Sequence, residues 1–312
     1  MDHQSLAKLL QVKIPNLDLH LNHPLAPYTT LKIGGPADLF IASQNPDQFI
    51  SIIKLLHQQK IDKPTILGHG SNVLISDSGI RSVVIQNSGD HITIDKEKAT
   101  LSSGTSLSHA IKFTLDKNLV GLEIFAYIPG TLGGAIHNNI HGFDKTNFSK
   151  FIDTIEVFNY QTGQLETLTV NDSHWSYDLS PFQSKFKNPA TTGPHLLITS
   201  VTLNLAKGNG QLAKTKAEET IATKKITQPF NSAGCTFKNP AGQSAGQIID
   251  SLHLKGQTIG HVKISPLHAN FIVNTDQATA KDYLKLVRLI QKKVKSATGI
   301  NLELEIKPLG KF

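Results

Sequence analysis

The chain has very little of several residue types that often carry chemistry or stabilise a small fold. It holds one cysteine, Cys235, and one tryptophan. A single cysteine cannot form an internal disulfide, and proteins without disulfides are typical of the reducing cytoplasm. Only Arg81 and Arg288 are arginines. Because base readout and stacking rely on arginine, this scarcity argues against a nucleic-acid partner.

Long apolar runs and processing signals are missing too. No run of about 18 apolar residues occurs, so we expect no membrane insertion. Residues 1–4 lack the basic region followed by an apolar stretch that marks a secretory signal. The histidines show no H-E-x-x-H spacing, so we expect no catalytic metal. These absences predict a cytoplasmic protein.

What is present fits a globular protein with a small anionic ligand. The 312 residues predict about two domains, and the hydrophobic content of 39% is enough for a core. The net charge of +7 suits an anionic small substrate. Solvated lysine faces that keep the protein in solution explain individual lysines equally well.

Two glycine-rich segments placed far apart are the most informative feature. Residues 68–72 read Gly-His-Gly-Ser-Asn, and residues 128–135 read Ile-Pro-Gly-Thr-Leu-Gly-Gly-Ala. Glycine lets backbone N–H groups approach a ligand, and consecutive exposed N–H groups bind anions. Two such segments favour a long ligand with phosphates in its middle, such as a dinucleotide. Neither matches the Rossmann or P-loop motif, and two tight surface turns are the alternative.

The periodicity of apolar residues predicts a mixed α+β fold. Asn45 and Pro46 begin a helix that ends near residue 58, and Ser106 begins another. A hairpin is expected around residues 161–163, and a linker at 207–210 precedes a polar helix at about 212–225. Strands are also expected at 63–67, 83–86, 91–95, 100–103, 196–205, 262–264 and 270–274, and Ser244 is expected to cap a short helix that reaches residue 252. Thr279 begins the clearest helix and Gly299 ends it.

Six motifs in the same order resemble the UDP-N-acetylenolpyruvoylglucosamine reductase family, flavoenzymes of peptidoglycan precursor synthesis that serve the cell wall, cell shape and cell division. The resemblance extends from about residue 22 to Gly310. Any one motif is moderate evidence, whereas six in order are strong evidence. They occupy residues 30–37, 67–74, 121–139, 233–240, 265–274 and 302–305.

The resemblance implies an FAD-binding domain of the vanillyl-alcohol-oxidase type in two subdomains, then a smaller α+β substrate-binding domain. We expect the parts at 1–85, 86–206 and 207–312. No long tyrosine-bearing insertion lies between Phe182 and the strand at 196–205, so the chain resembles the shorter family type. The family binds FAD without a covalent bond, and NADPH reduces the flavin before the enolpyruvyl UDP-sugar enters the same cleft.

The resemblance also assigns FAD contacts to both glycine-rich segments and their surroundings. These are Ile33, Gly34, Gly68, His69, Gly70, Ser71, Asn72, Val73, Leu74, Ile128, Pro129, Gly130, Thr131, Gly133, Gly134, Ala135 and Asn139.

Reduction of an enolpyruvyl ether needs a hydride at C3 and a proton at C2. Cys235 stands where the family usually has a serine, and a thiol is a good proton donor, with an ordinary pKa of about 8.5. A small buried apolar residue is the alternative role for a lone cysteine.

Glu305 aligns with the family's catalytic glutamate, although Glu303 would share its side of a strand. The expected substrate contacts are Tyr177, Lys238, Asn239 and His268, with Asn270 a weaker one; a structural role for His268 is equally expected.

Besides Cys235, the chain departs from the family at two places. Asp178 in Tyr-Asp-Leu-Ser-Pro-Phe stands where the family carries its catalytic arginine. Residues 140–143 read Ile-His-Gly-Phe, where small residues and glycine are usual. An ionised Asp178 would repel the substrate carboxylate. The missing positive charge could therefore come from Lys185, Lys187 or Lys238.

Three functions remain open from the sequence. The first is the NADPH-dependent reductase, and retention of Cys235, Asn239 and Glu305 together favours it. The second is another flavin oxidoreductase of the same fold with a different anionic substrate. The third is a flavin or sugar-nucleotide binder that lost turnover with the arginine. No obligate protein partner is expected.

Overall fold

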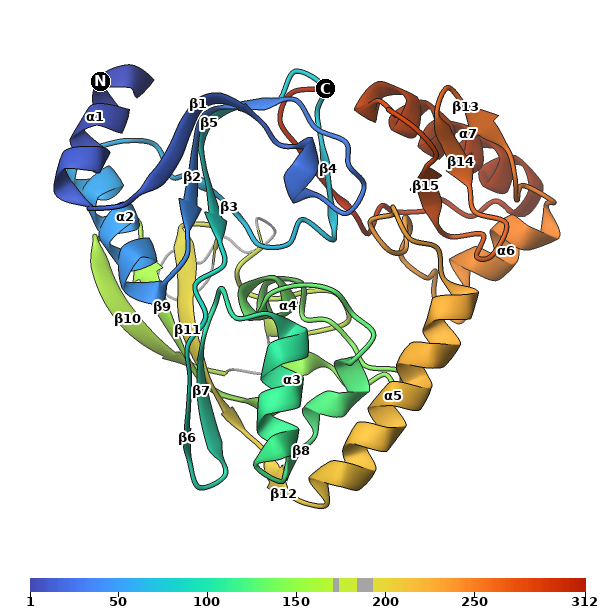
Figure 1. Ribbon diagram of the computed structural model, residues 1–312. Coiled ribbons are helices and arrows are strands. Elements are labelled where there is room, and N and C mark those ends of the chain that lie inside the picture. Colours follow the sequence, from blue (N-terminus) through green and yellow to red (C-terminus); the bar gives the residue numbers. More distant parts are fainter. Residues whose placement is uncertain (171–173, 184–192) are drawn as a thin grey trace. The chain divides into compact units, whose positions relative to one another are not determined.

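The computed structural model describes residues 1–170, 174–183 and 193–312, and these fold into two compact units (Figure 1). Unit 1 consists of Met1–Leu21, Leu39–Gly68 and Val83–Ile221. Unit 2 consists of Asn22–Asp38, His69–Ser82 and Ala222–Phe312. The chain therefore passes between the units several times, and neither unit is one continuous stretch of sequence.

Unit 1 contains an antiparallel sheet in the strand order β10-β9-β11-β7-β6. The strands are β6 (Ile92–Asp95), β7 (Lys98–Ser102), β9 (Ile152–Asn159), β10 (Gln164–Thr169) and β11 (Leu196–Asn204). β9 and β10 form the hairpin expected around residues 161–163, with Gln164 opposite Asn159. β11 lies in the centre, between β9 and β7.

Helices α3 (Leu107–Asp116) and α4 (Leu132–Asn138) cover the apolar core of this sheet (Figure 1). Ser106 caps α3 by accepting a hydrogen bond from the His109 N–H, which confirms the expected start. Buried residues of α3 and α4, such as Ile111 and Ile136, pack with strand residues such as Val157 and Val201. Burial of these side chains stabilises the frame that carries the second glycine-rich segment.

A second core in unit 1 lies between helices and a four-stranded sheet of order β1-β2-β5-β3. Its strands are β1 (Asp18–Pro24), β2 (Pro36–Ser43), β5 (Ile80–Asn87) and β3 (Thr65–Leu67), and its helices are α1 (His3–Lys13) and α2 (Pro46–Gln58). Asn45 caps α2 as expected by accepting from the Gln48 N–H. β3 leads directly into residue 68, so this sheet positions the start of the first glycine-rich segment.

Unit 2 has one core, formed by helices α6 (Ala245–Ser251) and α7 (Ala280–Thr298) and the sheet β13-β14-β15. The strands are β13 (Thr258–Ile259), β14 (Val262–Ile264) and β15 (Ile272–Asn274). Thr279 caps α7 and Gly299 ends it in the left-handed conformation, as the sequence predicts. Asp77 adds a second cap, because its carboxylate accepts from the N–H groups of Ala280 and Lys281.

A parallel pair of short strands completes unit 2. β4 (Val73–Ile75) pairs with β16 (Lys307–Leu309), so residues just after the first glycine-rich segment hydrogen-bond to the end of the chain. The other elements are β8 (Leu119–Val120), β12 (Ala206–Lys207), α5 (Gly210–Thr227) and the 3₁₀ turns η1 (Ala26–Tyr28), η2 (Leu122–Phe125) and η3 (Phe148–Phe151). None of the helices in the described part of the chain has the length and apolarity to span a membrane.

The second glycine-rich segment is partly helical, which the sequence analysis did not predict. Thr131 accepts a hydrogen bond from the Gly134 N–H and caps α4, so residues 132–138 form two helical turns. Glycine has a low intrinsic helix propensity, and tertiary packing of Leu132, Ala135 and Ile136 outweighs it here. Helix α1 and strands β1, β2 and β16 were also missed.

Candidate functional site

In unit 1 the two glycine-rich segments meet. A Cβ added to Gly68 would collide with the side chain of Thr131, the capping residue of α4. Gly68 therefore has to be glycine for the end of β3 to approach the start of α4. The expectation that both segments serve one ligand gains a structural basis at this contact.

The second segment is pinned to the loop between β7 and α3. Gly133 N–H donates to the Ser103 carbonyl at 2.8 Å, and Leu132 N–H donates to the Thr105 carbonyl at 2.9 Å. Leu107 N–H in turn donates to the Gly130 carbonyl at 2.9 Å. These bonds occupy carbonyl groups of both the loop and the glycine-rich segment, and they hold the starts of α3 and α4 next to each other.

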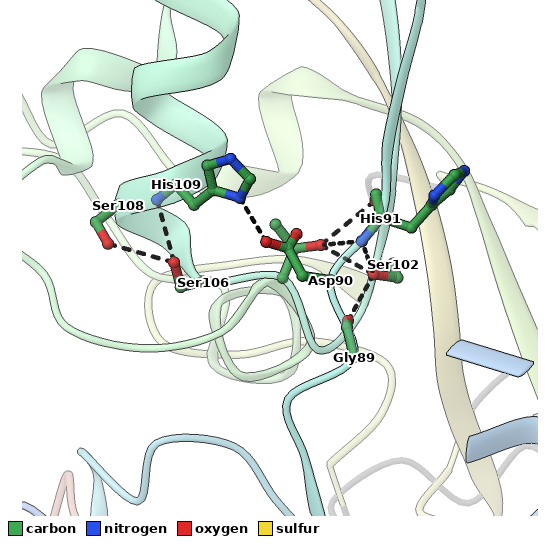
Figure 2. A network of polar contacts seen from close by, with 8 residues as sticks. Gly89, Asp90, His91, Ser102, Ser106, Ser108 and His109 are labelled. Carbon is green, nitrogen blue, oxygen red and sulfur yellow. Dashed lines mark hydrogen bonds and ion pairs between the residues drawn. The ribbon is translucent and has the colours of Figure 1, made fainter. Parts of the chain in front are cut away.

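A network of polar side chains supports this frame (Figure 2). The Ser102 hydroxyl donates to the Gly89 carbonyl at 2.7 Å and accepts from the His91 N–H at 2.9 Å. His109, on the first turn of α3, lies at hydrogen-bond distance from the Asp90 carboxylate. The network ties the loop before β6 to the end of β7 and to α3. The sequence analysis did not identify it, since serines and glycines in loops carry no distinctive pattern.

In unit 2 the remaining part of the first segment is held by Thr30. The Thr30 N–H donates to the Gly70 carbonyl at 3.2 Å, and its hydroxyl donates to the Ser232 carbonyl at 2.6 Å. Ser232 is three residues before Cys235. One threonine therefore links the glycine-rich segment to the segment that carries the candidate proton donor.

The segment around Cys235 is also bonded to the segment around Glu305. Glu305 N–H donates to the Thr236 carbonyl, and Lys238 N–H donates to the Glu303 carbonyl, both at 2.9 Å. Phe237 and Leu304 form an isolated antiparallel bridge between them. The two candidate catalytic residues therefore lie on adjacent extended segments of one unit.

Exposure separates the two candidate glutamates. Glu305 is half-buried, whereas Glu303 is exposed. The choice of Glu305 over Glu303 stays a prediction. Cys235 is likewise half-buried, which distinguishes it from a core residue.

Asn270 has a structural role. It is 2% exposed, its side-chain oxygen accepts from the Phe237 N–H at 3.0 Å, and its side-chain nitrogen donates to the Phe237 carbonyl at 2.8 Å. A single amide thus satisfies both backbone groups of Phe237. The weaker expectation that Asn270 contacts substrate gains no support from this arrangement.

His268 and Asn239 lie near the start of α6. A Cβ added to Gly246 would come within 3.1 Å of His268 Cε1, and Asn239 accepts a hydrogen bond from the Ala245 N–H at 3.0 Å. The His268 Nδ1 accepts from the Asn270 N–H at 3.2 Å, which requires the neutral imidazole. Partial burial lowers the pKa of His268, and the nearby Lys224 and Lys255 lower it further while Asp250 acts in the opposite direction.

In unit 1, Tyr177 and Asp178 form the tip of a tight turn. Ser176 and Leu179 exchange two backbone hydrogen bonds of 3.1 Å, and Asp178 has a φ of 52°. Asn139 holds this turn, because its side-chain nitrogen donates to the Ser176 carbonyl at 2.8 Å. Asp178 is 8% exposed, and among the described residues His141 Nδ1 lies 3.5 Å from its carboxylate.

Among the described residues, a histidine faces Asp178. That Lys185, Lys187 or Lys238 supplies the missing positive charge stays a prediction. Lys185 and Lys187 lie outside the described residues, and Lys238 belongs to unit 2. His141 was not selected because it follows a glycine-rich helix and has no sequence neighbour that suggests a partner.

The other predicted residues divide between the units. Gly68, residues 128–135, Asn139 and Tyr177 belong to unit 1, and Ile33, Gly34, residues 69–74, Cys235, Lys238, Asn239, His268 and Glu305 belong to unit 2. Within unit 2, Gly34 lies close to Ile75, since a Cβ added there would come within 3.0 Å of the Ile75 Cβ. Thr30 and His141 are the residues of interest that sequence reasoning missed.

The described geometry fits a bound flavin dinucleotide. In unit 1, a Cβ at Gly68 would strike the Thr131 side chain and a Cβ at Gly133 would come within 3.1 Å of Ser103, so both glycines allow close packing around the second segment. In unit 2, the Gly70 and Asn72 carbonyls are bonded to Thr30 and Lys307 N–H groups. Because these carbonyl groups are bonded within the protein, the N–H groups of the loop can serve to bind an anion.

Comparison with known proteins agrees with this geometry. Residues 37–169 match an FAD binding domain, which places the chain among FAD-binding proteins. Residues 225–309 match the C-terminal domain of UDP-N-acetylenolpyruvoylglucosamine reductase. The chain belongs to the UDP-N-acetylenolpyruvoylglucosamine reductase family.

Similarity to individual members covers nearly the whole chain. The reductase of Listeria monocytogenes serotype 4a is 35% identical over 96% of this chain and 98% of its own length. That of Caldanaerobacter subterraneus is 37% identical over 94% of both chains. The crystal structure of the reductase (MurB) from Thermus caldophilus superimposes with a TM-score of 0.77 at 31% identity, and covers 95% of this chain and 99% of its own.

Removal of the Asn270 amide should destabilise unit 2 strongly. Asn270→Ala leaves the buried N–H and carbonyl of Phe237 without partners, at about 1–3 kcal/mol each. We expect a loss of about 2–5 kcal/mol in the free energy of unfolding, measured by urea denaturation. Asn209→Ala is the control, since its exposed side chain caps only the Leu212 N–H and should cost about 1 kcal/mol. Equal effects of the two variants would contradict the assigned role.

The lowered pKa of His268 predicts a loss of stability in acid. Since the folded state disfavours the imidazolium, the unfolded state binds the proton first as the pH falls below the ordinary histidine value of 6.5. The free energy of unfolding should therefore be highest above pH 6.5 and decrease from there toward the lower folded-state pKa. His268→Asn, which retains an acceptor for the Asn270 N–H, should reduce this slope. His261→Asn, at an exposed position, should leave it unchanged; identical slopes in all three proteins would contradict the prediction.

Proposed function

We propose that the protein catalyses the FAD-dependent, NADPH-driven reduction of UDP-N-acetylglucosamine enolpyruvate to UDP-N-acetylmuramate in peptidoglycan precursor synthesis. Family membership over nearly the full length supports this function. The observation that carries it at the level of residues is the pairing of the Cys235 and Glu305 segments in unit 2. Nucleic acid and an obligate protein partner have no part in this proposal, and the proposed location is the cytoplasm.

FAD is held, in this proposal, by the glycine-rich segments and their surroundings. The residues that the family resemblance assigns to FAD, namely Ile33, Gly68, residues 69–74 and residues 128–135, would bind its pyrophosphate and neighbouring groups. When bound, FAD would supply the redox chemistry, the transfer of a hydride from NADPH to C3 of the enolpyruvyl group. We retain residues 1–85 and 86–206 as the two FAD-binding subdomains and 207–312 as the substrate domain.

The protein residues move the proton and hold the substrate. The Cys235 thiol is proposed to donate a proton to C2, because a half-buried thiol near neutral pH is a better donor than a hydroxyl. Glu305 is proposed to contact the substrate carboxylate or the intermediate in its protonated form. Lys238 and Asn239 lie beside Cys235 in sequence and are proposed to contact the sugar nucleotide, as are His268 and Tyr177.

FAD binding should depend on the close approach at Gly68. Gly68→Val would force the end of β3 away from Thr131, and overpacking of this kind costs about 1–3 kcal/mol. We expect FAD affinity to fall about 10- to 100-fold, with far-UV circular dichroism unchanged. Gly70 is less suitable, since a Cβ there would strike the Tyr28 carbonyl and damage unit 2 itself. Gly256→Ala is the control for backbone strain without a steric clash, because a Cβ there meets nothing within 4 Å while the φ of 80° disfavours a side chain; full FAD occupancy in Gly68→Val would contradict the proposed site.

Replacement of Cys235 should separate the two half-reactions. In Cys235→Ala, reduction by NADPH should stay within about twofold of the wild-type rate, while reoxidation by the enolpyruvyl substrate should slow by about 10²–10⁴-fold. Cys235→Ser should retain much of the activity, because a hydroxyl can donate the same proton. Stopped-flow absorbance of the flavin measures both steps. Reoxidation of Cys235→Ala at the wild-type rate would make Cys235 structural, and a wild type that reduces with NADPH but ignores the substrate would favour another flavin oxidoreductase.

A further inference from the structure

The hydroxyl group of Tyr283 is buried in the core of unit 2, where Thr236 is its partner. Tyr283 lies on α7, and its hydroxyl oxygen is 3.1 Å from the hydroxyl oxygen of Thr236. Both residues are 0% exposed. Thr236 directly follows Cys235 in the sequence. The pair therefore joins α7 to the segment that carries the proposed proton donor.

Apolar packing of α7 does not require this hydroxyl group. The other buried residues of the helix are all apolar: Ala280, Leu286, Val287, Ile290 and Val294. A phenylalanine at position 283 would fill nearly the same volume and would leave no polar group to satisfy. Because burial of a hydroxyl group offsets most of what its hydrogen bond contributes, the net gain in stability is small. The contact with Thr236 is a better explanation of the hydroxyl group.

Thr236 is held by all three of its polar groups. Its N–H donates to the Asn270 carbonyl at 2.7 Å, and its carbonyl accepts from the Glu305 N–H at 2.9 Å. These two bonds fix the peptide planes on both sides of the Thr236 Cα. The hydroxyl contact with Tyr283 fixes the side chain. The backbone on the Thr236 side of Cys235 is therefore rigid.

The backbone on the other side of Cys235 is less constrained. Gly234 has a φ of 77°, and a Cβ added there would meet nothing within 4 Å. Glycine also has a wider range of backbone conformations than any other residue. The direction in which the Cys235 side chain extends therefore depends mainly on Thr236.

The first turn of α7 gives Tyr283 a firm base. Tyr283 N–H donates to the carbonyl of the capping residue Thr279 at 3.1 Å. The Asp77 carboxylate accepts from two further N–H groups of the same turn. Because the helix is capped twice at this end, the Tyr283 hydroxyl can hold Thr236 in one position.

Tyr283 is close to Cys235 but is not itself an acid for the reaction. Burial raises the pKa of Tyr283 above its ordinary value, the hydrogen bond with Thr236 lowers it, and the charge of an ionised Cys235 raises it. The net effect is upward, so the hydroxyl keeps its proton at neutral pH. Its role is that of an uncharged hydrogen-bonding group next to the Cys235 segment.

We propose that Tyr283 is a positioning residue for the Cys235 thiol, because its hydrogen bond to the Thr236 hydroxyl fixes the backbone from which the thiol extends. This inference rests on the proposed function. In the step that it serves, hydride addition to C3 leaves an electron pair at C2, the thiol S–H bond breaks, a C2–H bond forms, and a thiolate remains. Since a displacement of about 1 Å can cost about 10²-fold in rate, loss of the contact should slow this proton transfer.

The first test removes the hydroxyl group and measures both half-reactions of the FAD-loaded enzyme by stopped flow. In Tyr283→Phe, reduction by NADPH should stay within about twofold of wild type, while reoxidation at saturating UDP-N-acetylglucosamine enolpyruvate should slow about 10- to 100-fold. The substrate concentration that gives half of the maximal reoxidation rate should stay within about twofold, because the thiol is misplaced and substrate binding is not. Thr236→Val should behave like Tyr283→Phe, and Thr236→Ser, which retains the hydroxyl, should stay close to wild type.

Tyr160→Phe is the matched control. It also removes a hydroxyl group with one hydrogen bond, to the Ile61 carbonyl at 3.0 Å, but it lies in unit 1. This variant should leave both half-reactions unchanged. In a Cys235→Ala background, Tyr283→Phe should cause no further loss of reoxidation rate, since a positioning residue has no effect once the group that it positions is absent.

Alkylation of Cys235 gives a readout that does not depend on turnover. Cys235 is the only cysteine of the chain, so mass spectrometry after iodoacetamide treatment follows this thiol alone. In Tyr283→Phe the thiol should react several times faster than in the wild type, because a thiol that is not held in one orientation is more accessible to the reagent. Tyr160→Phe should react at the wild-type rate. Circular dichroism of both variants checks that the fold is retained, and if Tyr283→Phe does not fold, Thr236→Val and Thr236→Ser decide.

The outcomes separate this inference from the proposed function. If the wild type turns over and Tyr283→Phe matches it in reoxidation and alkylation, the inference is overturned and the function stands. An equal loss in the Cys235→Ala background, or a change in substrate concentration dependence alone, also overturns it. Reoxidation of Cys235→Ala at the wild-type rate removes the proposed donor, and the inference with it. A wild type that is not reoxidised by the enolpyruvyl substrate overturns the proposed function itself.

Discussion

The geometry of unit 2 depends on one extended segment near the end of the chain. Residues 303–309 hydrogen-bond in turn to the Cys235 segment, through Thr236 and Lys238, and to the first glycine-rich segment, through Asn72 and β4. Each backbone bond contributes only about 1 kcal/mol net, but together they fix three loops relative to one another. Thr30 adds a second link between Gly70 and Ser232. The candidate acid, the candidate glutamate and half of the cofactor loop are therefore one rigid arrangement.

Local chemistry made most helices predictable. Asn45, Ser106, Ser244 and Thr279 all cap helices where the sequence predicted them, because a side-chain oxygen next to an apolar repeat leaves few alternatives. The elements that the sequence analysis missed share a cause as well. β16 and β2 have no clear alternation of polar and apolar residues, and they pair with strands that are distant in the sequence. α4 has two glycines in its first turn, and glycine normally favours turns. Tertiary contacts decided these elements.

The residues of the candidate site also divide into those that the sequence could identify and those that it could not. The glycines, Cys235 and Glu305 could be selected from the sequence because they stand in motifs with a fixed order of residues. Asn270, Thr30 and His141 could not, since their roles arise from partners 33, 202 and 37 residues away in the chain. Asn270 illustrates the limit of sequence reasoning. The motif suggested that its amide contacts a ligand, whereas in the structure the amide hydrogen-bonds to the backbone N–H and carbonyl of Phe237.

In unit 1 the Asp178 carboxylate is buried, and His141 Nδ1 lies 3.5 Å from it. Such a pair loses strength rapidly with distance and depends on a rigid support. The bonds from Ser180 and Gln183 to the end of α4, and from Asn139 to Ser176, supply that rigidity. The same helix begins in the second glycine-rich segment, so within unit 1 α4 connects that segment to the turn at Asp178.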